Sequence, residues 1–197
     1  MFLISNVSYG AVITFDPATK AGSAGALLYD WTESGYLLEG SSFFLHTDSN
    51  VSSSVYPDNG TAYIRTTYNK PQLTLSNING QLFDLLSVDI AEFSIPTAQY
   101  RKPISIVGHK ADGSAVSTTM LADGIIDGHG PLADFETILF SEFTNLISVE
   151  LPSQYGYSID NIVVESVPEP TTLFLFAAGL AGLYTQRRVI RKNTIAA

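Results

Sequence analysis

Four carboxylates in the first half of the chain have the residue types that glycoside hydrolysis requires. Glu33 and Glu39 form one local pair, and Asp84 and Asp89 form another. A glycosidase places two such acids on either side of the bond that it cleaves. Eighteen acidic residues stand before position 168, however, so close pairs arise here without any catalytic role. No HExxH, GxSxG or phosphate-loop motif is present, and we expect no enzyme and no catalytic residue.

The histidines and the absence of cysteine restrict metal and redox chemistry. His46, His109 and His129 are scattered, and only Asp127-Gly128-His129 resembles a ligand-bearing turn. An ordinary polar loop from Gly124 to Pro131, rich in glycine, explains that turn better. With no cysteine, the chain forms no disulfide, thiolate metal site or cysteine nucleophile.

Charge divides the chain in two. Four of the ten basic residues lie in the last eleven positions, which leaves six basic and eighteen acidic side chains in residues 1–167 and a net charge of −12 there. Such a segment repels nucleic acid, so we expect no nucleic-acid partner. A soluble acidic surface is the main interpretation, and cation binding is the alternative.

Residues 11–166 have the pattern of an antiparallel β-domain. Short segments rich in β-branched and aromatic residues recur about every ten residues, and several alternate between apolar and polar. Asn79-Gly80 predicts a tight turn, and residues 111–114 predict a hairpin between two strands. No segment before residue 170 has a capped helical period. The fold class we expect is all-β, an antiparallel β-sandwich, with a jelly roll as the first choice.

The first ten residues resemble the end of a signal peptide. Residues 1–10 are largely apolar, lack a basic start, and end with small residues of the kind that precede a signal-peptidase cut. We interpret them as the remnant of an export signal; a plain first strand is the alternative.

Three different elements follow one another at the C-terminal end. Pro168-Glu169-Pro170 is a stiff extended spacer, because proline lacks an N–H and restricts the preceding residue. The uncharged apolar segment from Thr171 to Tyr184 comes next. As a helix it reaches about 21 Å, a marginal span for a hydrocarbon core of about 30 Å. A cluster of basic residues closes it and predicts a cytoplasmic end: Arg187, Arg188, Arg191 and Lys192. We expect a short transmembrane helix rather than a buried C-terminal helix of the domain.

This order of elements over residues 167–192 resembles the PEP-CTERM sorting signal of Gram-negative bacteria. The resemblance implies an exported precursor anchored in the inner membrane by its C-terminal helix. It further implies recognition and cleavage by an exosortase, and a final place at the cell surface or in an exopolysaccharide and biofilm matrix. Residues 193–197 are an extension that this family pattern does not explain.

A second resemblance concerns the two ends of the β-domain. Asp16, after the first strand, and Asp160, in the last strand, are similar in position to acids of carbohydrate-binding jelly rolls. In those folds the first and last strands are neighbours, and an acid there helps to hold a structural Ca²⁺. The resemblance makes Asp16 and Asp160 candidate calcium ligands, with Asn161 a weaker one. The alternative is that Asp160 and Asn161 bind backbone groups at the end of the sheet.

The function we expect is a non-catalytic surface or matrix module with polysaccharide as a candidate partner. A secreted hydrolase with a diverged active site is the alternative. Aromatic residues suitable as sugar platforms are Trp31, Tyr36, Tyr56, Tyr100, Tyr155 and Tyr157. Since strands use aromatic residues in their cores, we expect at least half of these to be buried, and we assign no sugar-binding residue. Ice binding is disfavoured, because the chain has no regular Thr-x-Thr ladder.

Overall fold

The computed structural model describes residues 10–16, 26–46, 57, 60–66, 72–92, 103–121, 135–151, 157–168, 179 and 184. Every strand pairing among them is antiparallel, which confirms the all-β prediction. The strands are β1 (Gly10–Ile13), β2 (Ala26–Glu33), β3 (Tyr36–His46), β4 (Tyr63–Thr66), β5 (Leu73–Asn77), β6 (Phe83–Glu92), β7 (Pro103–Lys110), β8 (Ala115–Leu121), β9 (Glu136–Leu139), β10 (Leu146–Leu151) and β11 (Tyr157–Ser166).

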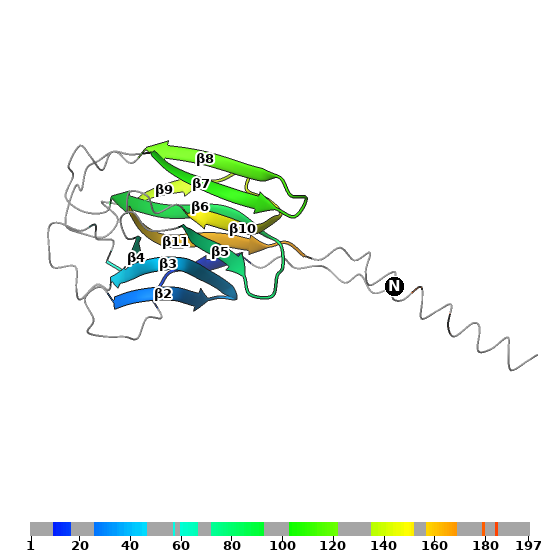
Figure 1. The fold of residues 1–197 in the computed structure, drawn as a ribbon, viewed down its shortest axis with the longest axis horizontal. Coiled ribbons are helices and arrows are strands. Elements are labelled where there is room, and N and C mark those ends of the chain that lie inside the picture. The colour runs from blue at the N-terminus through cyan, green and yellow to red at the C-terminus, as the bar shows by residue number, and fades with distance from the viewer. Residues whose placement is uncertain are drawn as a thin grey trace, which may run out of the picture. The chain divides into compact units, whose positions relative to one another are not determined.

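The strands form one hydrogen-bonded path that closes on itself. Its order is β8-β7-β10-β5-β3-β4-β11-β6-β9, with β2 on β3 and β1 on β11. A further pairing, Leu146 with Phe83, joins β10 to β6 and closes the path. The turns β2–β3, β5–β6 and β7–β8 lie together at one end of the domain (Figure 1). These pairings give a closed, barrel-like antiparallel sheet around one apolar core.

Alternation along the strands builds the core. In β5, Leu73 and Leu75 are fully buried, whereas Thr74 and Ser76 face outward. Every strand except β2, β8 and β9 places at least one fully or nearly fully buried apolar side chain in a single cluster, and those three contribute partly buried ones. Each such side chain contributes about 1.5–3 kcal/mol when buried, so this inward face is the main source of stability in a domain without disulfides.

Gly40 divides β3 into two parts that pair with different strands. The first part of β3 pairs with β5, and its last part, from Phe43 to His46, pairs with β4. Gly40 lies between the two parts with a φ of 129°, and a Cβ there would lie 2.4 Å from the Gln72 carbonyl oxygen. Only glycine fits this close approach.

Two compact units divide the chain, Ser8–Val167 and a second one formed by Met1–Val7 with Pro168–Ala197. The first holds the whole sheet, and β1 begins at Gly10, one residue before the domain start that the sequence predicts. In the second, Gly179 and Tyr184 are helical. The rest of the predicted membrane segment, the spacer after Pro168, the basic cluster at residues 187–192 and the extension at 193–197 lie outside the described residues. Among the described residues, no helix has the length and apolar character needed to cross a membrane.

Candidate functional site

Glu33 accepts hydrogen bonds from the two residues that follow β1. Its Oε1 accepts hydrogen bonds from the backbone N–H (3.1 Å) and hydroxyl (3.2 Å) of Thr14. Its Oε2 accepts from the N–H of Phe15 (3.1 Å) and from Nε1 of Trp31 (2.9 Å). Phe15 is fully buried with a φ of 60°, a conformation that bulky residues rarely adopt. The carboxylate therefore stabilises a sharp exit from β1, and the backbone after it leads to Asp16.

Asp16 and Asp160 both bind the segment that precedes β4. Oδ1 of Asp16 accepts from the N–H of Ala62 at 3.0 Å, and Oδ2 of Asp160 accepts from the hydroxyl of Thr61 at 2.9 Å. Asp160 is fully buried, and its Oδ1 also accepts from the N–H of Asn161 at 2.7 Å. The two predicted calcium ligands thus converge on two adjacent residues.

The position of Asp160 in the sheet explains this convergence. On one edge of β11, β4 pairs with Ser158 and Ile159, and β1 pairs with residues 162–165. Asp160 and Asn161 fill the gap between those two strands. The prediction that the first and last strands are neighbours is confirmed by these pairings.

Asn161 continues the network to the other edge of β11. It has a φ of 45° at a break in the register between β11 and β6. Its side-chain amide donates to Oδ2 of Asp89 at 2.8 Å, and the hydroxyl of Thr137 donates to Oδ1 at 2.6 Å. We name the connected carboxylates of Glu33, Asp16, Asp160 and Asp89 the carboxylate network.

Hydrogen bonds account for the placement of every carboxylate in this network. The alternative interpretation of Asp160 and Asn161 is backbone binding at the end of the sheet. Asp160 does accept from the backbone N–H of Asn161, but both residues lie in the middle of β11, and their hydrogen bonds with Thr61 and Asp89 are with side chains. Within the described residues, no three histidine, aspartate or glutamate side chains are grouped to hold a metal ion. Calcium binding by Asp16 and Asp160 stays a prediction.

Three of the four acids considered for glycoside hydrolysis accept hydrogen bonds within the domain. Glu33 and Asp89 belong to the carboxylate network, and Oδ1 of Asp84 accepts from the N–H of Asn145 at 2.8 Å. Glu39 is exposed on β3, where it pairs with Asp30 of β2. Asp127 and His129 lie outside the described residues.

The described aromatic candidates are committed to the interior. Tyr36 and Tyr157 are buried in the core, and burial raises the pKa of the Tyr157 phenol above its usual range. Trp31 packs on the core beside Phe15, with ring centroids 5.8 Å apart. Residues 56, 100 and 155 lie outside the described part of the chain. Tyr36 and Tyr157 are therefore unavailable as sugar platforms, whereas Trp31 is only partly buried.

One outward sheet face is polar. Across β8, β7, β10, β5, β3 and β2, one register row reads Ser117, Val107, Glu150, Thr74, Glu39 and Asp30. Glu150 is held at its centre, because Oε2 accepts from Nε2 of Gln72 at 2.9 Å and Oε1 lies 3.1 Å from Nε2 of His109. Strands lie about 4.8 Å apart, so polar side chains repeat at that spacing from Glu150 to Asp30, and Val107 interrupts the row before Ser117. We call this row, together with Gln72 and His109, the polar face. It could not be predicted from the sequence, because it depends on the register of six strands.

His46 differs from His109 in its surroundings. It is 6% exposed and stacks on Tyr63, with ring centroids 5.1 Å apart and an interplanar angle of 7°. Burial, and then the nearby positive charge of Arg65, lowers its pKa to about 4. His46 is therefore neutral in the folded domain at neutral pH.

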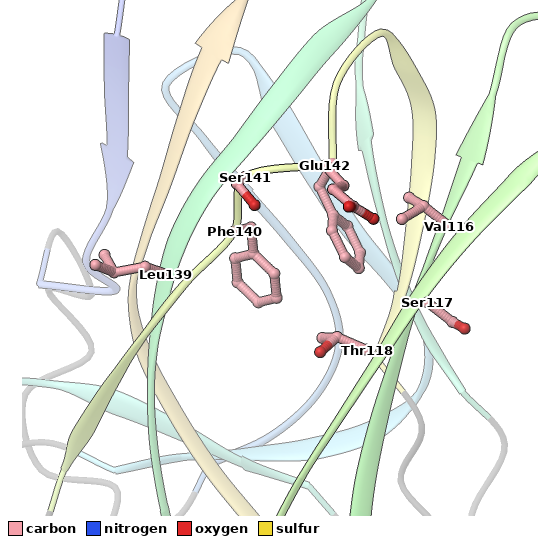
Figure 2. A pocket seen from close by; sticks show the side chains of 8 residues that line it. Val116, Ser117, Thr118, Leu139, Phe140, Ser141 and Glu142 are labelled. Atoms are coloured by element: carbon pink, nitrogen blue, oxygen red, sulfur yellow. The ribbon is translucent and has the colours of Figure 1, made fainter.

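A small hollow lies between β8 and the connection from β9 to β10. Figure 2 shows the Phe140 ring between strand β8 and that connection, with the side chains of Ser141 and Glu142 close by. The hollow measures about 150 Å³, whereas pockets for small molecules measure roughly 300–1,000 Å³. It is too small to define a ligand site.

The last strand leads directly into the predicted sorting segment. β11 ends at Ser166, and the N–H of Val167 still donates to the Leu82 carbonyl at 2.8 Å. Pro168, the next residue, is exposed and outside the sheet. The folded domain and the Pro-Glu-Pro segment are thus adjacent in the chain.

Comparison with known proteins identifies this segment. The family model of the PEP-CTERM protein-sorting motif matches residues 166–188. The chain is therefore a protein that carries the PEP-CTERM motif, as the order of its three C-terminal elements predicts. The match supports export and exosortase-dependent sorting.

The β-domain has less informative relatives. No curated protein matches the chain. Among solved structures, one similar chain is the CBM22-1–GH10 portion of the endo-1,4-β-D-xylanase 10B of Clostridium thermocellum, complexed with xylohexaose. The identity is 7% and the TM-score 0.36 over 73% of this chain and 29% of that one, so the present chain spans less than a third of that protein. A likeness at this level says nothing of what this chain binds.

Proposed function

We propose that the chain is a surface or extracellular-matrix protein of a Gram-negative bacterium, which an exosortase cleaves near Pro168-Glu169-Pro170. The apolar segment Thr171–Tyr184 forms a short helix that holds the precursor in the inner membrane. The arginines and lysine at 187–192 lie on its cytoplasmic side. The observation that supports this proposal is the PEP-CTERM match at residues 166–188, which begins where the last strand ends.

The sandwich, in this proposal, is a jelly-roll-like binding or structural module without catalytic activity that associates with exopolysaccharide. The polar face supports this role, since its hydroxyl, carboxylate, imidazole and amide groups suit hydrogen bonding to sugar hydroxyls. The engagement of Glu33, Asp84 and Asp89 by neighbouring strands supports the absence of catalysis.

Deletion of residues 168–197 tests the sorting part of the proposal. A precursor with a complete signal peptide, expressed in a host with an exosortase, should be found with the membrane before it is processed. The deletion variant should be released as a soluble protein without a membrane-bound stage. Identical fractionation of the two forms would refute the sorting function.

A glycan array combined with a reducing-sugar assay tests the sandwich. The purified domain should bind one or more polysaccharides and release no reducing sugar. Glu150→Ala should weaken binding, and Glu136→Ala, the same change on β9 away from the polar face, should not. Release of reducing sugar would favour the hydrolase instead.

A further inference from the structure

The sorting motif begins at the last residue of the folded sheet. The motif match begins at Ser166, the last residue of β11, which pairs with Phe83 of β6. Val167 follows, and its N–H donates to the Leu82 carbonyl at 2.8 Å. The residues immediately before Pro168 therefore have their backbone groups committed to the domain.

An enzyme that binds this segment needs those same backbone groups. A peptide bound in an extended form gives its main-chain N–H and C=O groups to the protein that holds it. Cleavage near residues 168–170 brings residues 165–167 into or beside the binding cleft. Those three residues cannot bond both to β6 and to the enzyme, so one set of bonds must be lost.

One pairing near the end of β11 brings two acidic residues opposite each other. Glu165 pairs with Asp84 on one side and with Gly10 on the other. Two carboxylates directly opposite each other destabilise a strand pair, and glycine adds no side-chain contact. The Asp84 carboxylate accepts from the N–H of Asn145 at 2.8 Å, and the register places Asp84 directly opposite Glu165.

We propose that Glu165, Ser166 and Val167 detach from the sheet before the exosortase processes the motif, so that the stability of the strand end sets the rate of processing. The inference rests on the proposed sorting function. When opening and closing are faster than cleavage, the cleavage rate follows the fraction of molecules in the open form. The like-charge pair raises that fraction while the rest of the domain stays folded.

A cross-link across the strand end gives the sharpest test. The chain has no cysteine of its own, so Asp84→Cys with Glu165→Cys supplies its only thiols. Paired residues in antiparallel strands have Cα atoms about 4.5–5.5 Å apart, which suits a disulfide. Purified full-length precursor is mixed with exosortase-containing membranes in its oxidised and reduced forms. We expect the oxidised form to resist processing and the reduced form to be cut, each serving as the control for the other.

Two further variants should change the rate of processing by the exosortase in opposite directions. A six-residue Gly-Ser insert between Val167 and Pro168 separates the motif from the sheet and should speed processing several-fold. Glu165→Lys converts the repulsion with Asp84 into attraction and should slow processing roughly two- to tenfold. Glu136→Lys, the same change on β9, should leave the rate unchanged.

Equal processing of the oxidised, reduced and insert forms would overturn the detachment proposal and leave sorting intact. If no form is cut, including the one with the insert, the sorting function itself fails and the detachment proposal with it.

Discussion

The two halves of β11 are held in the sheet in different ways. At its beginning, Thr66 uses one hydroxyl to accept from the Tyr157 N–H (2.7 Å) and donate to the Tyr157 carbonyl (3.1 Å). Asp160 then anchors the middle of the strand from a fully buried position. At its end, Glu165 faces a glycine and another carboxylate.

The two halves of β11 therefore have different surroundings. The first half holds β4 and part of β6, and side-chain hydrogen bonds supply that rigidity. The second half pairs with β1 and β6 and continues into the PEP-CTERM motif. A carboxylate is stabilising in the first half because donors surround it, and destabilising in the second because an acid faces it.

The largest expected effect is the difference in unfolding free energy between variants at Asp160 and variants at Glu165. Asp160→Ala leaves the hydroxyl of Thr61 and the N–H of Asn161 without their acceptor, which should cost about 3 kcal/mol of unfolding free energy. Glu165→Ala should change it by less than about 0.5 kcal/mol. Urea denaturation of both variants measures the contrast, and Asp160→Asn, which keeps the volume, should lie between them. Equal losses at the two positions would break the comparison.

The second effect concerns His46, beside the strand that pairs with the beginning of β11. Its pKa is about 4 in the folded domain, against about 6.5 when unfolded. The unfolded chain therefore takes up a proton first as pH falls below 6.5, and stability decreases until about pH 4. Between pH 7 and pH 5 the loss should be about 2 kcal/mol.

His46→Phe isolates this contribution, because it keeps a ring against Tyr63 and removes the titration. The stability of the variant should fall about 2 kcal/mol less than that of the wild type over the same pH range. Parallel pH profiles, measured by urea denaturation, would show that His46 is accessible to protons in the folded domain.

A smaller effect should come from the backbone of Asn161. Both Asn161→Gly and Asn161→Ala lose the hydrogen bond to Asp89, but only glycine adopts a φ of 45° without strain. The alanine variant should therefore be about 1 kcal/mol less stable than the glycine variant. If thermal and urea denaturation rank them the other way, the turn at Asn161 does not constrain β11.

The smallest expected effect is the change in Tm on addition of Ca²⁺. If Asp16 and Asp160 hold the ion, millimolar Ca²⁺ should raise Tm by about 2–4 °C, which corresponds to about 1 kcal/mol in a domain of this size. Mg²⁺ should do less, because it demands a tighter octahedral shell. Asp16→Asn should remove most of the gain, and Asp30→Asn, an equal change of charge on β2, should retain it. A Tm indifferent to Ca²⁺ and to chelator would leave these carboxylates with hydrogen bonding alone.

The sequence predicted what depends on local patterns. Strand periodicity predicted the all-β class, the Asn79-Gly80 turn is present with Gly80 N–H bonded to the Asn77 carbonyl, and the hairpin at residues 111–114 joins β7 and β8. The sorting motif was recognisable because its order of elements is linear and needs no tertiary contact.

The β2–β3 hairpin was missed for a physical reason. A register shift between Leu28 and Asp30 interrupts the alternation of β2, and the bend at Gly40 interrupts that of β3. Each irregularity moves side chains to the opposite face, so the apolar pattern loses its period of two. The roles of Glu33 and Asp89 were not predictable either, since most of their hydrogen-bond partners lie between 18 and 72 residues away in the sequence.

The position of β11 also has a consequence for the order of folding during export. β1 is among the first segments of the chain, yet in the described sheet its pairing is with β11, the last strand, where Gly10 meets Glu165. A chain that crosses the membrane from its N-terminus presents β1 early and must wait for β11 before that contact forms. Contacts between such distant segments form slowly because the intervening loop must first close. The domain therefore completes its sheet only when the residues directly ahead of the sorting motif have emerged. The last step of folding then coincides with the emergence of the motif.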